Sequence, residues 1–155
     1  MSSQAGYILT QFTPFTFVGK SIRTSNETAE ADIGNLWRQF LEQKWYDAIE
    51  HKSGDRIIGL YYNYEGDFTK PYSFAIGCRV ENTESVPEGM IVIEIPESNY
   101  AEFISKGTIP DCIADTWIKI WNSDIERSYT FDIEVYSLDD LQSDNAQVPI
   151  FISVK

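Results

Sequence analysis

Cysteine and histidine are scarce in this sequence of 155 residues, which has two Cys and one His. Cys78 and Cys112 form no Cys-x-x-Cys pair and have no neighbouring His, so the sequence indicates neither a disulfide framework nor a metal site. His51 follows Glu50 at the polar end of an expected helix, where we expect a surface role rather than catalysis. Glycine-rich phosphate loops are also missing, and we expect no metal and no cofactor.

Long apolar runs are missing as well, and positively charged residues are outnumbered by acidic ones. No run of about 18 apolar residues occurs, and the N-terminus lacks the charged start and apolar core of a signal peptide, so we expect a cytoplasmic protein without membrane contact. The chain has 12 basic and 24 acidic residues, for a net charge of −12. Such a charge opposes binding to phosphate backbones, and there is no helix-turn-helix, basic run or zinc-finger spacing. We expect no direct nucleic-acid binding.

Aromatic residues, in contrast, are abundant. They make up 14% of the chain, with nine Tyr, nine Phe and four Trp. A chain of this length forms one domain of ordinary size, residues 1–155, and can bury a sizeable core. More rings are present than a core alone requires, which suggests a surface that binds a ligand.

Two segments carry apolar residues at helical spacing, namely 27–50 and 109–125. Asn26 or Thr28 is a candidate cap for the first helix, and Pro110 lies near the first turn of the second. The sequence therefore predicts two main helices.

Extended segments surround these helices in a repeated order. The expected strands are Phe15–Thr24, Arg56–Tyr64, Tyr72–Val80, Gly89–Gly107, Tyr129–Ser137 and Val148–Lys155. Strand, helix, strand, strand occurs twice, which predicts pseudo-repeats at about 7–80 and 89–155 joined by a polar linker. We expect an α+β fold with an antiparallel sheet or partial barrel, two main helices, and a central ligand pocket where the halves meet.

The segment Phe-Asp-Ile-Glu-Val-Tyr, residues 131–136, is the strongest chemical signal. Alternation along a strand puts Asp132, Glu134 and Tyr136 on the face opposite Phe131 and Ile133. If the apolar face packs on the helices, Glu134 and Tyr136 point into the seam, where a carboxylate walled by rings would attract a cationic ligand. The alternative is that Glu134 lies on a solvated face.

Motifs along most of the chain resemble those of the GyrI-like small-molecule-binding superfamily, also known as the AraC effector-binding domain. The matching residues in the second half are Pro96, Tyr100, Phe103, Gly107, Trp117 and Ile133-Glu134-Val135-Tyr136. The matching stretches in the first half are Leu36-Trp37-Arg38-Gln39-Phe40 and GLYYNYEGDFTKPYSFAIGCRV. The resemblance rests on the order and spacing of these motifs together.

This resemblance implies a pocket role for Glu134, because in that family the Glu of the Glu-x-Tyr strand pairs with cationic, often aromatic, compounds. The remaining candidates for ligand binding are the aromatic residues Tyr136, Tyr62, Trp37, Trp117, Phe17 and Tyr64. Each Trp could equally be part of an ordinary core. We assign no catalytic residue.

Several functions follow from the resemblance. Many relatives carry the domain behind a DNA-binding helix-turn-helix, whereas six residues precede Tyr7 here. We therefore expect a stand-alone effector-binding domain, similar to drug-binding proteins from integron gene cassettes, that takes part in drug sensing or transcription regulation. One alternative is a protein-interaction module of the gyrase-inhibitor type, with the acidic tract 137–144 as a candidate surface. Another is a hydrolase of strained electrophilic toxins that uses Glu134 as acid or base. Monomer and dimer both stay open.

Overall fold

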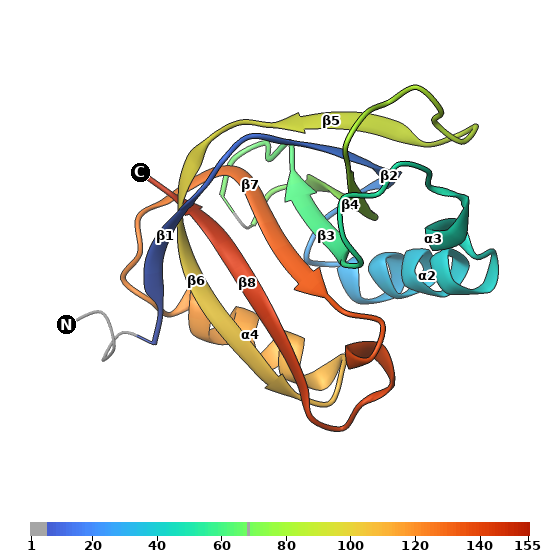
Figure 1. Cartoon of the computed structure of the whole chain (residues 1–155). Helices are drawn as coiled ribbons and strands as arrows, with labels where there is room; N and C mark the ends of the chain where they lie inside the picture. The colour runs from blue at the N-terminus through green and yellow to red at the C-terminus, as the bar shows by residue number, and fades with distance from the viewer. Residues whose placement is uncertain (1–5, 68) are drawn as a thin grey trace.

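The structure is a computed structural model that describes residues 6–67 and 69–155, and its centre is one antiparallel sheet of eight strands (Figure 1). The strands are β1 (Ile8–Phe12), β2 (Phe15–Thr24), β3 (Ile57–Tyr62), β4 (Tyr72–Val80), β5 (Ile91–Ile95), β6 (Ser98–Gly107), β7 (Arg127–Tyr136) and β8 (Ala146–Val154). Their order in the sheet is β1-β6-β8-β7-β3-β4-β2-β5, and the sheet does not close into a barrel. The α+β prediction is confirmed.

The sheet order is symmetric about the contact between β3 and β7. Outward from β3 come β4, β2 and β5, and outward from β7 come β8, β6 and β1. Each half thus contains the strands on either side of one main helix, plus an edge strand from the other half of the sequence. This order supports the predicted strand-helix-strand-strand repeat, which stays a prediction.

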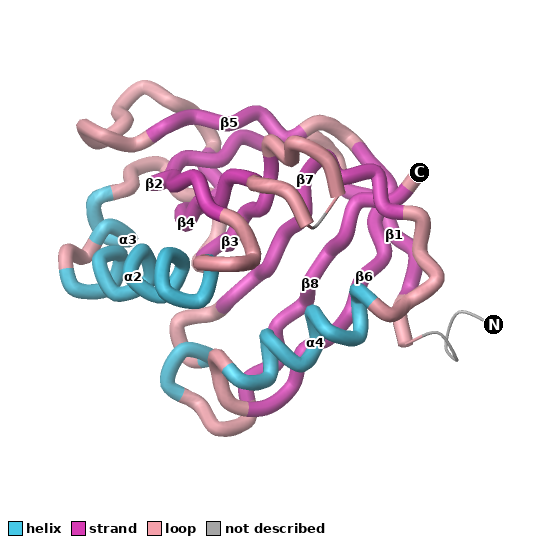
Figure 2. The backbone as a smooth tube through the Cα atoms, turned by 180° about the vertical axis from the view of Figure 1, so that it is seen from behind, coloured by secondary structure: helices cyan, strands magenta, loops and turns pink. Residues whose placement is uncertain are grey.

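Helices α2 (Ala29–Glu42) and α4 (Asp111–Trp121) lie on the same side of the sheet, as seen from behind in Figure 2. Thr28 is in the N-cap position immediately before α2, as predicted. Glu30 and Asp32 lie in the first turn, where their negative charges interact favourably with the helix dipole. Pro110 immediately precedes α4. None of the helices in the described part of the chain is long and apolar enough to span a membrane.

The predicted first helix is interrupted. Lys44 adopts a left-handed backbone with φ of 55°, which ends the helical hydrogen bonding, and a short helix α3 (Trp45–Ala48) follows. The prediction of one helix up to residue 50 was wrong for this reason. Leu41, expected on the buried stripe, is 49% exposed.

Strand β1 was missing from the sequence prediction. It pairs antiparallel with β6 at the edge of the sheet, and Ile8 and Leu9 are exposed there. A short edge strand with two of its three apolar side chains exposed has no clear period-2 pattern of burial. The pairing with β6, which is distant in sequence, is what makes it a strand.

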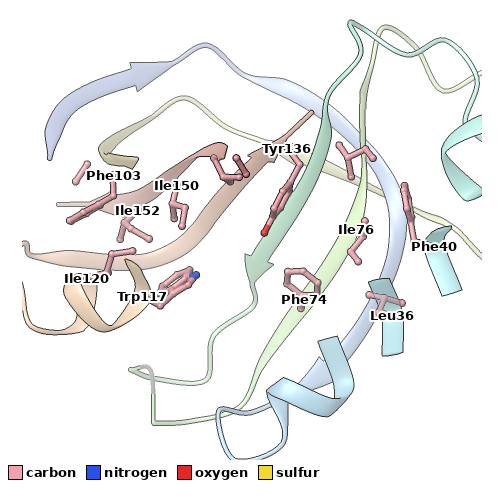
Figure 3. Packing of buried hydrophobic residues seen from close by; sticks show 14 residues of the cluster. Leu36, Phe40, Phe74, Ile76, Phe103, Trp117, Ile120, Tyr136, Ile150 and Ile152 are labelled. Carbon is pink, nitrogen blue, oxygen red and sulfur yellow. The ribbon is translucent and has the colours of Figure 1, made fainter. Parts of the chain in front are cut away.

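The two faces of the sheet bury separate hydrophobic clusters. The cluster under the helices, drawn in Figure 3, includes Leu36, Phe40, Phe74, Ile76, Phe103, Trp117, Ile120, Tyr136, Ile150 and Ile152. The other face buries Phe17, Ile58, Leu60, Ala75, Ile95, Tyr100, Ile133 and Phe151. Neighbouring residues of β3 and β7 therefore belong to different clusters, as the alternation of a strand requires.

Strands β2 and β4 approach very closely at Gly19 and Gly77, which are opposite each other in the sheet. A Cβ atom on Gly77 would lie 2.6 Å from the Cα of Gly19 and would also collide with the backbone of Val18. Only the absence of side chains allows this approach.

We expect Gly77→Ala to lower the free energy of unfolding by about 1–3 kcal/mol or more, because the added methyl group meets backbone that cannot rotate away. Urea unfolding followed by circular dichroism measures the change. Gly34→Ala is the control: Gly34 is in α2 with open space around it, so alanine there should stabilise by roughly 0.5–1 kcal/mol. Equal stability of Gly77→Ala and wild type would contradict the close approach.

Candidate functional site

Glu134 is a buried carboxylate at the centre of the sheet, with 1% of its surface exposed. It lies on β7 opposite Gly59 of β3. A Cβ atom on Gly59 would lie 3.1 Å from Oε1 of Glu134, which is a tight contact. The glycine therefore leaves the room that the carboxylate occupies.

Three aromatic side chains donate hydrogen bonds to this carboxylate. Oε1 accepts from the Tyr136 hydroxyl at 2.6 Å, and Oε2 accepts from Trp117 Nε1 at 2.7 Å and from the Tyr61 hydroxyl at 2.9 Å. The donors come from β7, α4 and β3 respectively. Figure 3 shows the Trp117 nitrogen and the Tyr136 hydroxyl turned toward the middle of the core. Helix and sheet are thus joined through one carboxylate.

Burial raises the pKa of Glu134 above its usual value of 4.5, and the three hydrogen bonds oppose that rise. Burial and the neighbouring Glu134 charge also raise the pKa of Tyr61 and of Tyr136 well above 10.0. Both hydroxyls therefore keep their protons and act as donors at neutral pH.

Aromatic rings surround the carboxylate on the helix side of the sheet. The centroids of Tyr61 and Trp117 are 5.0 Å apart, and those of Tyr61 and Phe74 are 4.7 Å apart. The Trp37 ring of α2 packs edge-on against Tyr136, with 4.9 Å between the ring centroids, and Trp37 is only half-buried. Trp37 and Tyr61 are thus the partly exposed rings of this group, whereas Trp117, Phe74 and Tyr136 are buried.

A second polar cluster lies two residues before Glu134 on the same face of β7. Asp132 accepts a hydrogen bond from Arg127 Nη2 at 2.7 Å, from the Tyr64 hydroxyl, and from the Ser153 backbone N–H at 2.9 Å. Arg127 and Asp132 form a buried ion pair, with 6% and 0% of their side chains exposed. The Arg127 Cζ atom is 5.6 Å from the centroid of Trp117, the same ring that binds Glu134.

The described residues contain no group of three His, Cys, Asp or Glu side chains that could hold a metal ion. A surface hollow of about 460 Å³ is lined by Phe12, Arg56, Ile104, Val135, Gln147, Pro149 and Phe151. None of these residues contacts the Glu134 carboxylate. The candidate ligand site is therefore the buried Glu134 carboxylate with its surrounding rings, and not this hollow.

A family model named "integron-associated effector binding protein" matches residues 9–154. The chain belongs to this effector-binding family. The resemblance inferred from the motifs is thereby confirmed.

Individual relatives agree with this assignment. The YobU protein of Bacillus subtilis (strain 168) is 35% identical to this chain over 146 residues, which are 90% of this chain and 91% of YobU. YobU is named as a transcriptional regulator. The integron cassette protein VCH_CASS2 of Vibrio cholerae has 27% identity and a TM-score of 0.77, covering 97% of this chain and 96% of its own. The structure of SAV2435 bound to tetraphenylphosphonium has 21% identity and a TM-score of 0.82, covering 96% and 93%.

In this effector-binding protein, four of the predicted ligand-binding residues lie together. Tyr136 and Trp117 each donate a hydrogen bond to Glu134, and Trp37 packs on Tyr136. Tyr64 lies farther along, at the Arg127–Asp132 pair. The structure thus divides this set between the two polar clusters.

Phe17 and Tyr62, also predicted, lie on the opposite face of the sheet. Both belong to the second hydrophobic cluster, and the Tyr62 hydroxyl pairs with that of Ser21 at 2.7 Å. The helices cover the face that carries Glu134, whereas the sequence reading put the helices on the face of Ile133. That expectation was wrong, because a hydrogen-bonded carboxylate and large rings can be buried as readily as aliphatic residues.

Tyr61 and Arg127 are site residues that the sequence reading missed. Tyr61 and Tyr62 are adjacent, and alternation shows only that they face opposite sides, so the pairing of β3 with β7 decides which one meets Glu134. Arg127 precedes the regular strand pattern, and the irregularity of β7 between Arg127 and Asp132 turns it inward. No local sequence signal reports that turn.

Glu134 makes the stability of the fold depend on pH. Its folded pKa is raised, so its contribution to stability is complete below the unfolded value of about 4.5 and is lost as pH rises through the folded pKa. We compare the free energy of unfolding of wild type with that of Glu134→Gln. We expect the difference, wild type minus variant, to fall as pH rises above the unfolded pKa. Urea unfolding of both proteins across pH 4 to 9 measures this difference. A difference that rises with pH would contradict the direction.

Proposed function

We propose that this effector-binding protein holds an amphipathic organic cation against Glu134, with aromatic rings as the walls of the site, and that this binding serves drug sensing or transcription regulation. The observation that carries the proposal is a buried carboxylate without a cationic partner. Ion pairs within the described residues involve Glu65, Asp55 and Asp132, but not Glu134. The positive charge that would balance Glu134 has to come from outside the chain.

The energetics favour such a ligand. A buried carboxylate loses its hydration, and hydrogen bonds from Tyr136, Trp117 and Tyr61 offset only part of this loss, since its pKa stays raised. A cation next to the carboxylate would offset more. Each ring face turned toward the cation would add roughly 0.5–2 kcal/mol.

The relatives support the same class of ligand. SAV2435 binds tetraphenylphosphonium, a cation covered by aromatic rings, and it has the same fold. YobU carries a regulator's name, which supports a regulatory use of binding. We extend both properties to this chain as part of the proposal.

Access to the carboxylate requires movement of a wall. Glu134 is 1% exposed and Trp117 is 9% exposed, so a ligand cannot reach the carboxylate past the side chains as they stand. Trp37 is half-buried, and it touches Tyr136 through an edge contact rather than a hydrogen bond. We propose that rotation of Trp37 opens the site, since this movement breaks the fewest polar interactions.

The hydrolase alternative has less support from the geometry. A general acid or base needs contact with a water or substrate atom. Both oxygens of Glu134 are bound to aromatic donors, and Asp132 is held by Arg127 and Tyr64. Neither carboxylate is presented to a reactant.

Tetraphenylphosphonium and tetraphenylborate have the same size and shape but opposite charge, and so they isolate the electrostatic part of binding. We expect the cation to quench tryptophan fluorescence saturably and the anion to bind at least about tenfold more weakly, a difference of about 1.4 kcal/mol. Glu134→Gln should remove most of this preference, whereas Glu97→Gln, which neutralises an exposed carboxylate, should keep it. Absence of saturable binding by the cation, or an equal preference in both variants, would refute the proposal.

Binding of the cation should also depend on pH. Because burial raises the pKa of Glu134 above its usual value, this carboxylate becomes fully charged at a higher pH than an exposed glutamate does. We expect affinity for tetraphenylphosphonium to increase with pH in wild type and to be nearly flat in Glu134→Gln. Calorimetric titration at several pH values measures both curves, and a flat wild-type curve would argue against contact with this carboxylate.

A further inference from the structure

Arg127 is a buried cation with more hydrogen-bond donors than acceptors around it. An arginine has five N–H groups. Nη2 donates to Asp132 at 2.7 Å and more weakly to the Tyr64 hydroxyl at 3.4 Å. Nε and Nη1 are buried and have no hydrogen-bond partner among the described residues. Three of the five N–H groups are therefore without an acceptor.

Asp132 cannot supply the missing acceptors. Its Oδ2 already accepts from Arg127 and from the Tyr64 hydroxyl, and its Oδ1 accepts from the backbone N–H and the hydroxyl of Ser153 at 2.9 and 3.2 Å. The carboxylate is saturated by this protein's own donors. All hydrogen-bonding positions of Asp132 are thus occupied, whereas the Nε and Nη1 donors of Arg127 lack acceptors. Burying these donors unpaired costs free energy unless another group accepts their hydrogen bonds.

Three rings stabilise the charge of Arg127 without accepting its in-plane N–H groups. The Cζ atom is 4.3 Å from the centroid of Tyr129, 5.6 Å from that of Trp117 and 5.8 Å from that of Tyr64. Cation-π contacts act through the faces of the rings. An oxygen lone pair is still needed for Nε and Nη1.

The backbone is strained where it builds this cluster. Tyr129 has φ of 55° and lies within the irregular part of β7, and Asn63, which precedes Tyr64, has φ of 56°. A left-handed backbone is costly for a residue such as Tyr129. Two of the four non-glycine residues with positive φ in the described part of the chain thus lie beside this cluster.

Trp117 connects Arg127 with Glu134. Its indole N–H binds the Glu134 carboxylate at 2.7 Å, and its ring lies 5.6 Å from the guanidinium. A ligand that lies along Trp117 would meet a negative group at one end and free N–H donors at the other.

We infer that Nε and Nη1 of Arg127 form a second subsite, which takes a neutral carbonyl oxygen of the same ligand whose cationic part Glu134 holds. This inference rests on the proposed function. A carbonyl fits better than a carboxylate, because Asp132 already neutralises Arg127 and would repel a second negative charge. The ligand class is therefore an aromatic cation that carries an amide or ketone.

The test compares tetraphenylphosphonium with its derivatives that carry a carboxamide at the para or the meta position of one ring. Hydrogen bonds to a charged donor are strong enough that one of the two derivatives should bind wild type about tenfold more tightly than tetraphenylphosphonium does. Arg127→Lys keeps the positive charge but removes the Nε–H and the planar fork. We expect this variant to lose the tenfold gain of the carboxamide derivative over tetraphenylphosphonium. Arg56→Lys, at an exposed side chain, should keep the gain.

A second measurement uses the wild-type protein, so it does not depend on whether a variant folds. The Arg127 Nε–H resonance in a ¹H–¹⁵N spectrum should shift when the carboxamide derivative is added, and should shift less with tetraphenylphosphonium. If tetraphenylphosphonium binds but neither derivative gains affinity, or if Arg127→Lys weakens all probes equally, the carbonyl subsite is refuted and the proposed function stands. If no probe binds wild type, both are refuted.

Discussion

The burial of one carboxylate, that of Glu134, is the interaction on which the helix side of the molecule depends. The charged form is stable inside the protein only if donors replace its water, and the donors come from β7, β3 and α4. Each of these elements must therefore keep its position relative to the others. Loss of the carboxylate would leave the Trp117 N–H and two tyrosine hydroxyls without their acceptor, which is why this group organises the core.

The central strand pair sets the geometry of that arrangement. β3 and β7 pair so that Gly59 faces Glu134 and Tyr61 faces Asp132. A shift of one residue would bring Leu60 or Ile58 to the helix side and send the tyrosine donor to the other cluster. The close approach of Gly19 and Gly77 holds β2 against β4 in the adjoining half of the sheet. The candidate site is thus built on the central strands of the sheet, with the partly exposed Trp37 of α2 at its side.

Charge is divided unevenly within this interior. Asp132 accepts four hydrogen bonds, one of them from the Arg127 cation, whereas Glu134 has aromatic donors but no cation. Arg127 in turn has N–H donors without acceptors. An interior evolved for stability alone would pair these groups or replace them with apolar residues. The same imbalance is expected of an effector-binding protein, in which a ligand completes the interactions. Membership of that family is consistent with this view.

Local patterns in the sequence were enough to predict the class of fold, most strand positions, the residue before α2 and the placement of Glu134 and Tyr136 on one face of a strand, because alternation and helical spacing are local properties of the chain. It did not determine the break at Lys44, the edge strand β1, or which of Tyr61 and Tyr62 faces the carboxylate. Phe17 looks as suitable for a ligand wall as Trp37 by residue type, yet the two belong to opposite faces of the sheet. Only the tertiary structure decided these points and gathered Arg127, Trp117 and Glu134 around one interior. Strand register and the side that the helices cover arise from contacts between residues far apart in the chain, and local sequence patterns carry no record of those contacts.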